Sequence, residues 1–157
     1  MNVILLPQSA LLPSSGAAEV IQVDGANVSW KEARFDADTE EQAFWQFAVP
    51  DDYDGGDVKV RVWWKAAAII GDVIFSIAHR AVADDAVWDA APSESAFASD
   101  TATGTTETLN KVEQTLSAPW SPGQVIQMAL RRKADDLSDT MLGDAKVLSV
   151  VVEFELA

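Results

Sequence analysis

Two acidic loops are the clearest candidates for chemistry in this chain. One surrounds Gly55–Gly56 and the other surrounds Gly143, and each contains several aspartates a few residues apart. Closely spaced carboxylates are the ligands that Ca²⁺ prefers, but neither loop continues to the glutamate that closes an EF-hand. Aspartate and glycine also form ordinary turns, and we favour that interpretation. Calcium stays the alternative, with candidate ligands Asp52, Asp54, Asp57, Asp139 and Asp144. We expect no other metal and no cofactor.

Enzymatic activity is not expected from the remaining reactive residues. The chain has no cysteine and a single histidine, His79, which excludes thiolate catalysis, cysteine-based zinc sites and a two-histidine metal site within one chain. A Ser-His-Asp triad would need His79, which shares a face with Phe75 and Ile77 and is therefore expected to be packed or at a rim. Because 25 acidic residues allow any carboxylate pairing, no glycosidase-type pair stands out.

The six tryptophans are many for this length. Trp45 and Trp64 fall on apolar rows and are predicted to lie in the core. The other four fall on polar faces or in loops, where exposed tryptophans suit sugar stacking or protein interfaces. We favour a protein interface, because an apolar N-terminal segment and a long loop accompany them. The predicted interface residues are Val3, Leu5, Leu11, Trp88, Phe97 and Trp120.

Alternating apolar residues predict the strands that must position these side chains. In residues 57–65, Val58, Val60, Val62 and Trp64 share one face, and residues 42–49 alternate in the same way. With the acidic turn between them, the two runs form a hairpin-like segment. Further strands are predicted at residues 2–6, 19–23, 28–35, 72–82, 105–116, 124–133 and 145–156. In the last of these, Leu148, Val150, Val152, Phe154 and Leu156 are expected on the buried face.

Residues 84–104 differ from the rest of the chain. They are rich in alanine, serine, aspartate and threonine, so we expect a long loop, which in a compact domain is usually functional or mobile. A short helix over Val87–Ala91 is an alternative, since Pro92 would end it.

The N-terminal segment is predicted to be an extended arm. Residues 1–17 have no charged side chain, and two prolines interrupt them. Without the basic region of a signal peptide, an arm that packs on its own sandwich or on a neighbouring subunit is the better interpretation. We therefore divide the chain into an arm, residues 1–17, and one β-sandwich domain, residues 18–157, and expect that deleting the arm spares the sandwich but weakens assembly.

Composition limits the class of protein. The chain has 157 residues, 48% of them hydrophobic, which is enough for one domain with a proper core. Its formal net charge of −14 disfavours binding to nucleic acid and to anionic membranes. Eight or nine short strands without a long amphipathic helix predict an all-β fold, an antiparallel β-sandwich with eight-stranded jelly-roll topology as the favoured arrangement.

Three segments resemble jelly-roll virion proteins of tailed bacteriophages. They are Phe47–Gly56, the strand Val58–Trp64 together with Gly71-Asp72-Val73, and Asp139–Ala145 before the last strand. The resemblance implies a capsid decoration (cement) protein, a head fibre or a tail-associated jelly roll, commonly trimeric. It supplies no active-site residues.

Three functional hypotheses follow. The first is a virion structural protein, placed by preference on the capsid exterior, that contacts the major capsid protein or another virion protein as a homotrimer. The second is a carbohydrate-binding or receptor-binding β-sandwich module of a phage tail or fibre, suggested by exposed tryptophans. The third, a hydrolase, has no recognisable catalytic arrangement to support it.

Overall fold

The computed structural model describes residues 1–157 apart from the side chain of Ala96. The chain forms ten strands and one short 3₁₀ helix, η1 (Pro7–Ser9). The strands are β1 (Asn2–Leu5), β2 (Glu19–Asp24), β3 (Ser29–Phe35), β4 (Glu41–Ala48), β5 (Tyr53–Lys65), β6 (Asp72–Val82), β7 (Ser93–Thr101), β8 (Asn110–Leu116), β9 (Val125–Arg132) and β10 (Ala145–Leu156). No helix in the described chain is long and apolar enough to cross a membrane.

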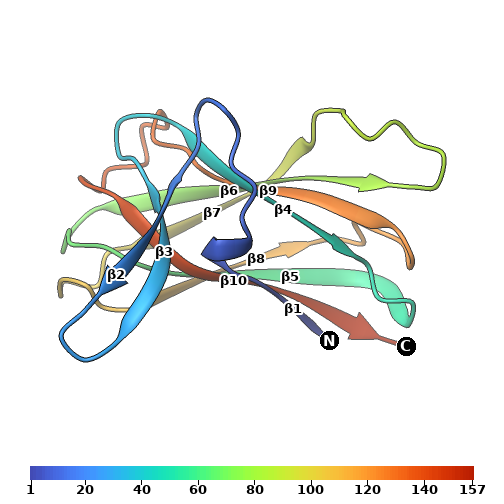
Figure 1. Cartoon of the computed structure of the whole chain (residues 1–157), viewed down its shortest axis with the longest axis horizontal. Helices are drawn as coiled ribbons and strands as arrows, with labels where there is room; N and C mark the ends of the chain where they lie inside the picture. The colour runs from blue at the N-terminus through green and yellow to red at the C-terminus, as the bar shows by residue number, and fades with distance from the viewer.

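The strands form two antiparallel sheets packed face to face, as the sequence predicts (Figure 1). The first sheet has the order β2-β3-β10-β5-β8, with β1 added to β10, and we call it the six-stranded sheet. The second has the order β4-β9-β6-β7, and we call it the four-stranded sheet. Both chain ends lie at the same end of the six-stranded sheet (Figure 1). The predicted all-β antiparallel sandwich is confirmed.

The core lies between the sheets and is built by the predicted alternation. Val58, Val60, Val62 and Trp64 on β5 are at most 1% exposed, and they face the buried row of β6 and β9 across the sandwich. The Trp64 ring meets Phe75 edge-on at 6.2 Å between centroids, and its indole nitrogen donates to Asp100. Buried tryptophans usually need such a polar partner, so the predicted core position of Trp64 is confirmed.

The N-terminal segment belongs to the sandwich. β1 pairs with β10 from Asn2–Glu153 to Leu5–Val150, and Leu5 is buried in the core. Further along, Leu11 forms a β-bridge with Phe44 of the opposite sheet. The alternative of an arm packed on its own sandwich is thus the one observed. Because this segment supplies a strand and core side chains, its predicted dispensability is not supported.

The hairpin-like interpretation of residues 42–65 is wrong. β4 pairs with β9 in the four-stranded sheet, whereas β5 pairs with β10 and β8 in the six-stranded sheet. The acidic turn after Pro50 therefore carries the chain from one sheet to the other. Local alternation predicts a strand and its buried face but carries no information about its partner.

The interpretation of residues 84–104 as loop is wrong for its second half. β7 pairs with β6 along most of its length, starting at Asp72–Thr101. Alanine and serine have low strand propensity, so pairing with a neighbouring strand overrides local preference here. Residues 84–92 form turns and irregular chain without the predicted helix.

A β-bulge changes the face of one predicted core residue in β10. The pairing with β5 shifts between Val147 and Ser149, so Val147 and Val150 are both buried. Leu148 is carried to the outer face, which corrects the predicted buried row. Val150, Val152 and Phe154 keep their predicted core positions. Leu156 was also predicted to be buried, but it is 42% exposed, beyond a second shift in the pairing between Phe154 and Leu156.

Candidate functional site

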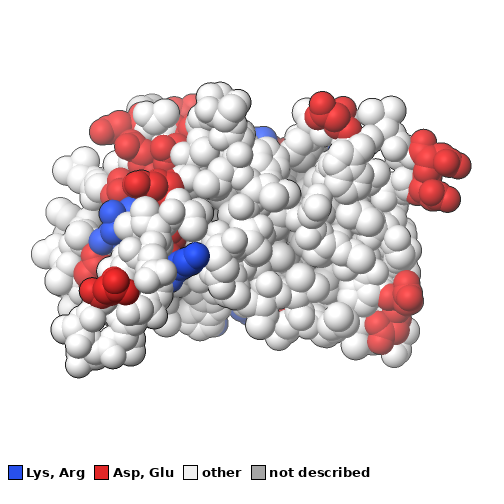
Figure 2. Space-filling model, in the orientation of Figure 1, with Lys and Arg blue, Asp and Glu red and all other residues white. Residues whose placement is uncertain are grey.

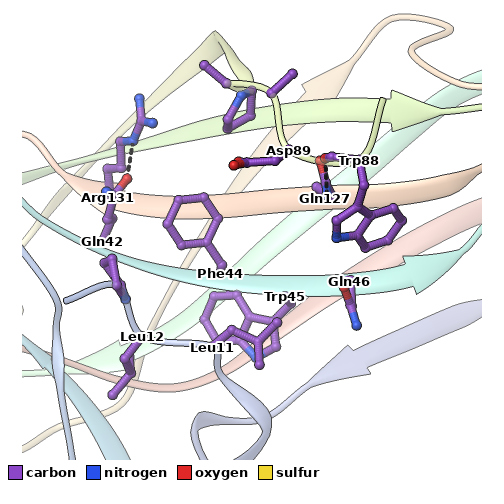
Figure 3. A pocket seen from close by; sticks show the side chains of 14 residues that line it. Leu11, Leu12, Gln42, Phe44, Trp45, Gln46, Trp88, Asp89, Gln127 and Arg131 are labelled. Atoms are coloured by element: carbon purple, nitrogen blue, oxygen red, sulfur yellow. Dashed lines mark hydrogen bonds between the residues drawn. The ribbon is translucent and has the colours of Figure 1, made fainter. Parts of the chain in front are cut away.

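A groove of about 660 Å³ lies on the outer face of the four-stranded sheet (Figure 3). Its floor is formed by the outward side chains of β4 and β9. One wall is the N-terminal segment at Leu11–Pro13, and the other is the loop 88–92. The volume is within the range of about 300–1,000 Å³ typical of ligand sites. We call it the Trp88 groove; the residues used below are Phe44, Gln42, Gln46, Trp88, Asp89, Gln127 and Arg131.

The Trp88 loop is held above the sheet through its backbone. Arg80 Nη1 and Gln127 Nε2 donate to the carbonyl oxygen of Trp88 at 2.9 and 3.0 Å, and Arg80 also donates to the Val87 carbonyl. Because these hydrogen bonds are made to the main chain, the indole ring stays free to contact a ligand, and Trp88 is 51% exposed. Two strand residues thus fix the backbone that carries an exposed aromatic ring at one end of the groove.

The floor combines an aromatic ring with planar polar groups. Phe44 lies between Gln42 and Gln46 on β4, and all three side chains face outward because Ala43 and Trp45 face the core. Arg131 Nε donates to Gln42 Oε1 at 2.9 Å, which leaves the two Nη groups of the guanidinium directed away from that bond. In Figure 3 the carboxylate of Asp89 points into the groove above Phe44. Amide, guanidinium and carboxylate groups can each bind a pair of neighbouring hydroxyl groups.

Only two of the predicted interface residues meet at this groove. Leu11 is 51% exposed on one wall and Trp88 stands on the other. Phe97 is exposed on β7 outside the groove, and Val3 packs against the core. Leu5 and Trp120 are buried inside the sandwich, and this placement removes them from the residues that a partner could reach.

The candidate calcium ligands are not brought together. No group of three or more histidine, aspartate or glutamate side chains that could hold a metal occurs in the described part of the chain. Asp54 accepts a hydrogen bond from the backbone of Gly56 at 2.7 Å, as turn aspartates do. Asp52 is exposed in the turn before β5, Asp57 is exposed within β5, and Asp144 lies in the other loop.

Asp139 is paired with a cation that the sequence analysis did not single out. The carboxylate accepts two hydrogen bonds from the buried guanidinium of Arg132, at 2.8 and 3.0 Å. Arg132 Nη1 and Nη2 also donate to the carbonyls of Phe35, Gly143 and Met141. All five N–H donors of this arginine are therefore used, and the acidic loop is tied to the sandwich by a buried ion pair.

His79 has the packed position expected for it. Its Nδ1 accepts a hydrogen bond from the Trp120 indole at 3.1 Å, and the two rings meet edge-on. Burial lowers the pKa of His79 below its ordinary value, which favours the neutral ring that this hydrogen bond requires. No described acid completes a catalytic triad with it in the hydrogen bonds observed.

The sequence analysis did not identify several groove residues, because only the tertiary structure brings them together. The alternation of β4 and β9 identifies Phe44, Gln42 and Gln127 as outward-facing, and that much is readable in the sequence. Their meeting depends on the pairing of β4 with β9, which local pattern does not specify. Asp89 was missed because it lies in the irregular segment before β7.

The fold is similar to that of several carbohydrate-binding modules of known structure. No protein-family model and no curated protein sequence matches the chain. Among solved structures, a family 35 carbohydrate-binding module from Clostridium thermocellum is similar with a TM-score of 0.66, 13% identity and 99% coverage of both chains. The family 35 module of Cellvibrio japonicus Abf62 gives a TM-score of 0.61 and 10% identity, covering 98% of this chain and 93% of that one.

A third similar structure contains a sugar. The module CBM6cm-2 of lichenase 5A from Cellvibrio mixtus, in complex with cellotriose, gives a TM-score of 0.56 and 12% identity, covering 98% of this chain and 97% of that module. The TM-scores show a shared jelly-roll-like sandwich, and at such low identity the likeness extends to the fold alone. The virion resemblance is supported only to that extent, since the similar structures named here are sugar-binding modules.

Proposed function

We propose that this chain is a non-catalytic carbohydrate-binding β-sandwich module and that the Trp88 groove is its sugar site. The observation that carries the proposal is the exposed Trp88 ring, whose backbone Arg80 and Gln127 hold beside a row of amide and guanidinium groups. The similarity of the whole fold to carbohydrate-binding modules supports it. This is the alternative hypothesis of the sequence analysis, now preferred to capsid decoration.

The binding mechanism follows from the chemistry of the groove. A pyranose ring has an apolar face of C–H groups, which an indole ring can cover with little loss of side-chain entropy. Equatorial hydroxyl groups extend from the edge of the ring, close to its mean plane, and can meet Gln46, Asp89 and Arg131. Since the groove is open along its length, we expect an oligosaccharide rather than a single sugar.

Calorimetric titration with neutral oligosaccharides, beginning with cellotriose, tests the proposal. We expect the best ligand to lose at least about tenfold in affinity in Trp88→Ala, because losing an aromatic hot-spot contact typically costs about 2 kcal/mol or more and tenfold corresponds to about 1.4 kcal/mol. Trp63→Ala is the matched control, since Trp63 lies on the outer face of the other sheet. A blank panel, or equal losses in the two variants, would contradict the sugar site.

Attachment to a virion remains a prediction, as does the homotrimer. A phage tail or fibre is a setting in which a sugar-binding sandwich would serve host recognition. Light scattering of the purified chain and its detection in purified particles test these two points separately. A strict monomer that is absent from particles would count against both, without affecting the sugar-binding proposal.

A further inference from the structure

The outer face of the six-stranded sheet has a second hollow, of about 620 Å³, which we call the Trp30 site. It lies over β3, β10 and β5, on the opposite face of the sandwich from the Trp88 groove. Trp30 lines it together with apolar side chains of Val23, Val28 and Leu148. The bulge in β10 that turns Leu148 outward helps to form its wall.

The charge at the Trp30 site is opposite to that of the molecule. Four cations, Lys31, Arg34, Lys65 and Lys146, line it with two carboxylates, Glu32 and Glu107. The excess of two positive charges stands out in a chain of net charge −14 with only 11 basic residues. Figure 2, in which β2 and β3 lie in front at the left, shows a broad uncharged middle, acidic side chains toward the two ends, and basic side chains beside acidic ones in the region of β2 and β3. At physiological ionic strength, charges more than about 8 Å away are largely screened, so the local cations dominate.

Buried Glu32 organises these groups. Its Oε2 accepts a hydrogen bond from the Trp30 indole at 2.7 Å and lies 3.2 Å from Lys65 Nζ. Its Oε1 accepts from Arg34 Nε at 2.8 Å. Although burial alone would raise the pKa of Glu32, hydrogen bonds from Trp30, Arg34 and Lys65 hold it below its ordinary value. Buried ion pairs add little net stability. The effect of Glu32 is instead to fix the orientation of the Trp30 ring and the Arg34 guanidinium.

Donors remain for a ligand after these internal bonds. Arg34 uses only Nε, and within the part of the chain that the structure describes, no acceptor binds its Nη groups. Lys146 contacts Glu107 and has further N–H donors. Glu107 itself has a φ of 55°, a left-handed conformation uncommon for a residue with a β-carbon, and it holds Lys65 and Lys146 on the same carboxylate.

We propose that the Trp30 site binds an anionic sugar residue, one that carries a sulfate ester or a carboxylate. The free edge of Arg34 and the ammonium of Lys146 bind the oxyanion. Lys65 Nζ lies over the Trp30 ring at 4.8 Å from its centroid, so Leu148 and the part of Trp30 that Lys65 leaves uncovered pack against the sugar ring. A sulfate ester and a carboxylate would bind these groups in the same way, and the titration with both acidic sugars distinguishes them. The inference rests on the proposed carbohydrate-binding function but concerns a different site and a different ligand charge.

Titration of the full chain by NMR tests the proposal, with the Trp30 indole N–H signal as reporter. Probes are glucose 6-sulfate, glucuronate, neutral glucose and inorganic sulfate. We expect one or both acidic sugars to shift this signal, and neutral glucose and inorganic sulfate to shift it far less. Lys146→Gln should weaken the effect by about tenfold or more, because a charge-assisted contact is lost. Lys111→Gln, a cation over Trp63 on the same sheet, is the matched control and should change nothing.

The outcomes are distinct. No shift with either acidic sugar, an equal shift with inorganic sulfate, or unchanged binding in Lys146→Gln would overturn the Trp30 site. In Trp88→Ala the binding of acidic sugars should persist while that of neutral oligosaccharides is lost. Failure of one site therefore does not imitate failure of the other.

Discussion

At the residue scale, the two proposed sugar sites depend on the hydrogen-bond partners of a few polar side chains. Gln127 and Arg80 donate hydrogen bonds to the backbone of the Trp88 loop, so the ring itself remains free to contact a ligand. Glu32 acts differently on Trp30 at the other sheet, because its carboxylate accepts a hydrogen bond from the indole N–H of the ring itself. In both cases a strand side chain holds part of a tryptophan, the backbone of Trp88 or the ring of Trp30, and this residue is not the one that would touch a ligand.

His79 provides a pH prediction at this scale. Its pKa is lowered in the fold by burial, so the unfolded chain binds the proton more tightly. Stability should therefore be lost as pH falls below the unfolded value of about 6.5. Urea unfolding of the wild type and His79→Gln at pH 7.5 and 5.5 checks this. The wild type should lose more stability than the variant between these values. Equal losses would show that His79 makes no contribution.

At the element scale, most strands of the sandwich can be predicted one by one from the sequence, but their pairing into two sheets cannot. The segment 72–82 has the predicted bounds, and the core row from Val58 to Trp64 is confirmed, because period-two alternation reports a buried face directly. β7 was not predicted, because its alanines and serines have little strand propensity. Leu148 was assigned to the wrong face, because a regular alternation of residues cannot predict a β-bulge. The Trp88 groove needs the pairing of β4 with β9 and the return of the loop over them, which only tertiary structure supplies.

β1 gives the prediction that belongs to this scale. Deleting residues 1–6 removes four paired positions along β10 and the buried Leu5 side chain. We expect the free energy of unfolding to fall by about 2–5 kcal/mol, the usual range for loss of a large core side chain. Chemical denaturation measures it. An unchanged midpoint would restore the earlier expectation of a dispensable arm.

At the scale of the whole molecule, two opposite faces of one sandwich present different side-chain chemistry to the two proposed ligands. The outer face of the four-stranded sheet presents Trp88 and Phe44 with neutral amides and Arg131. The outer face of the six-stranded sheet presents Trp30 among four cations, in a chain that is otherwise strongly acidic. A module with both sites could hold a polysaccharide that combines neutral and acidic residues.

The most direct test of the sugar-binding account is a map of backbone amide shifts on adding the tightest neutral oligosaccharide. The account predicts that the large shifts fall on β4, β9 and residues 88–92, and that Trp88→Ala removes them. Shifts confined to the opposite sheet or to the loops 66–71 and 133–144, with the Trp88 groove unaffected, would contradict it.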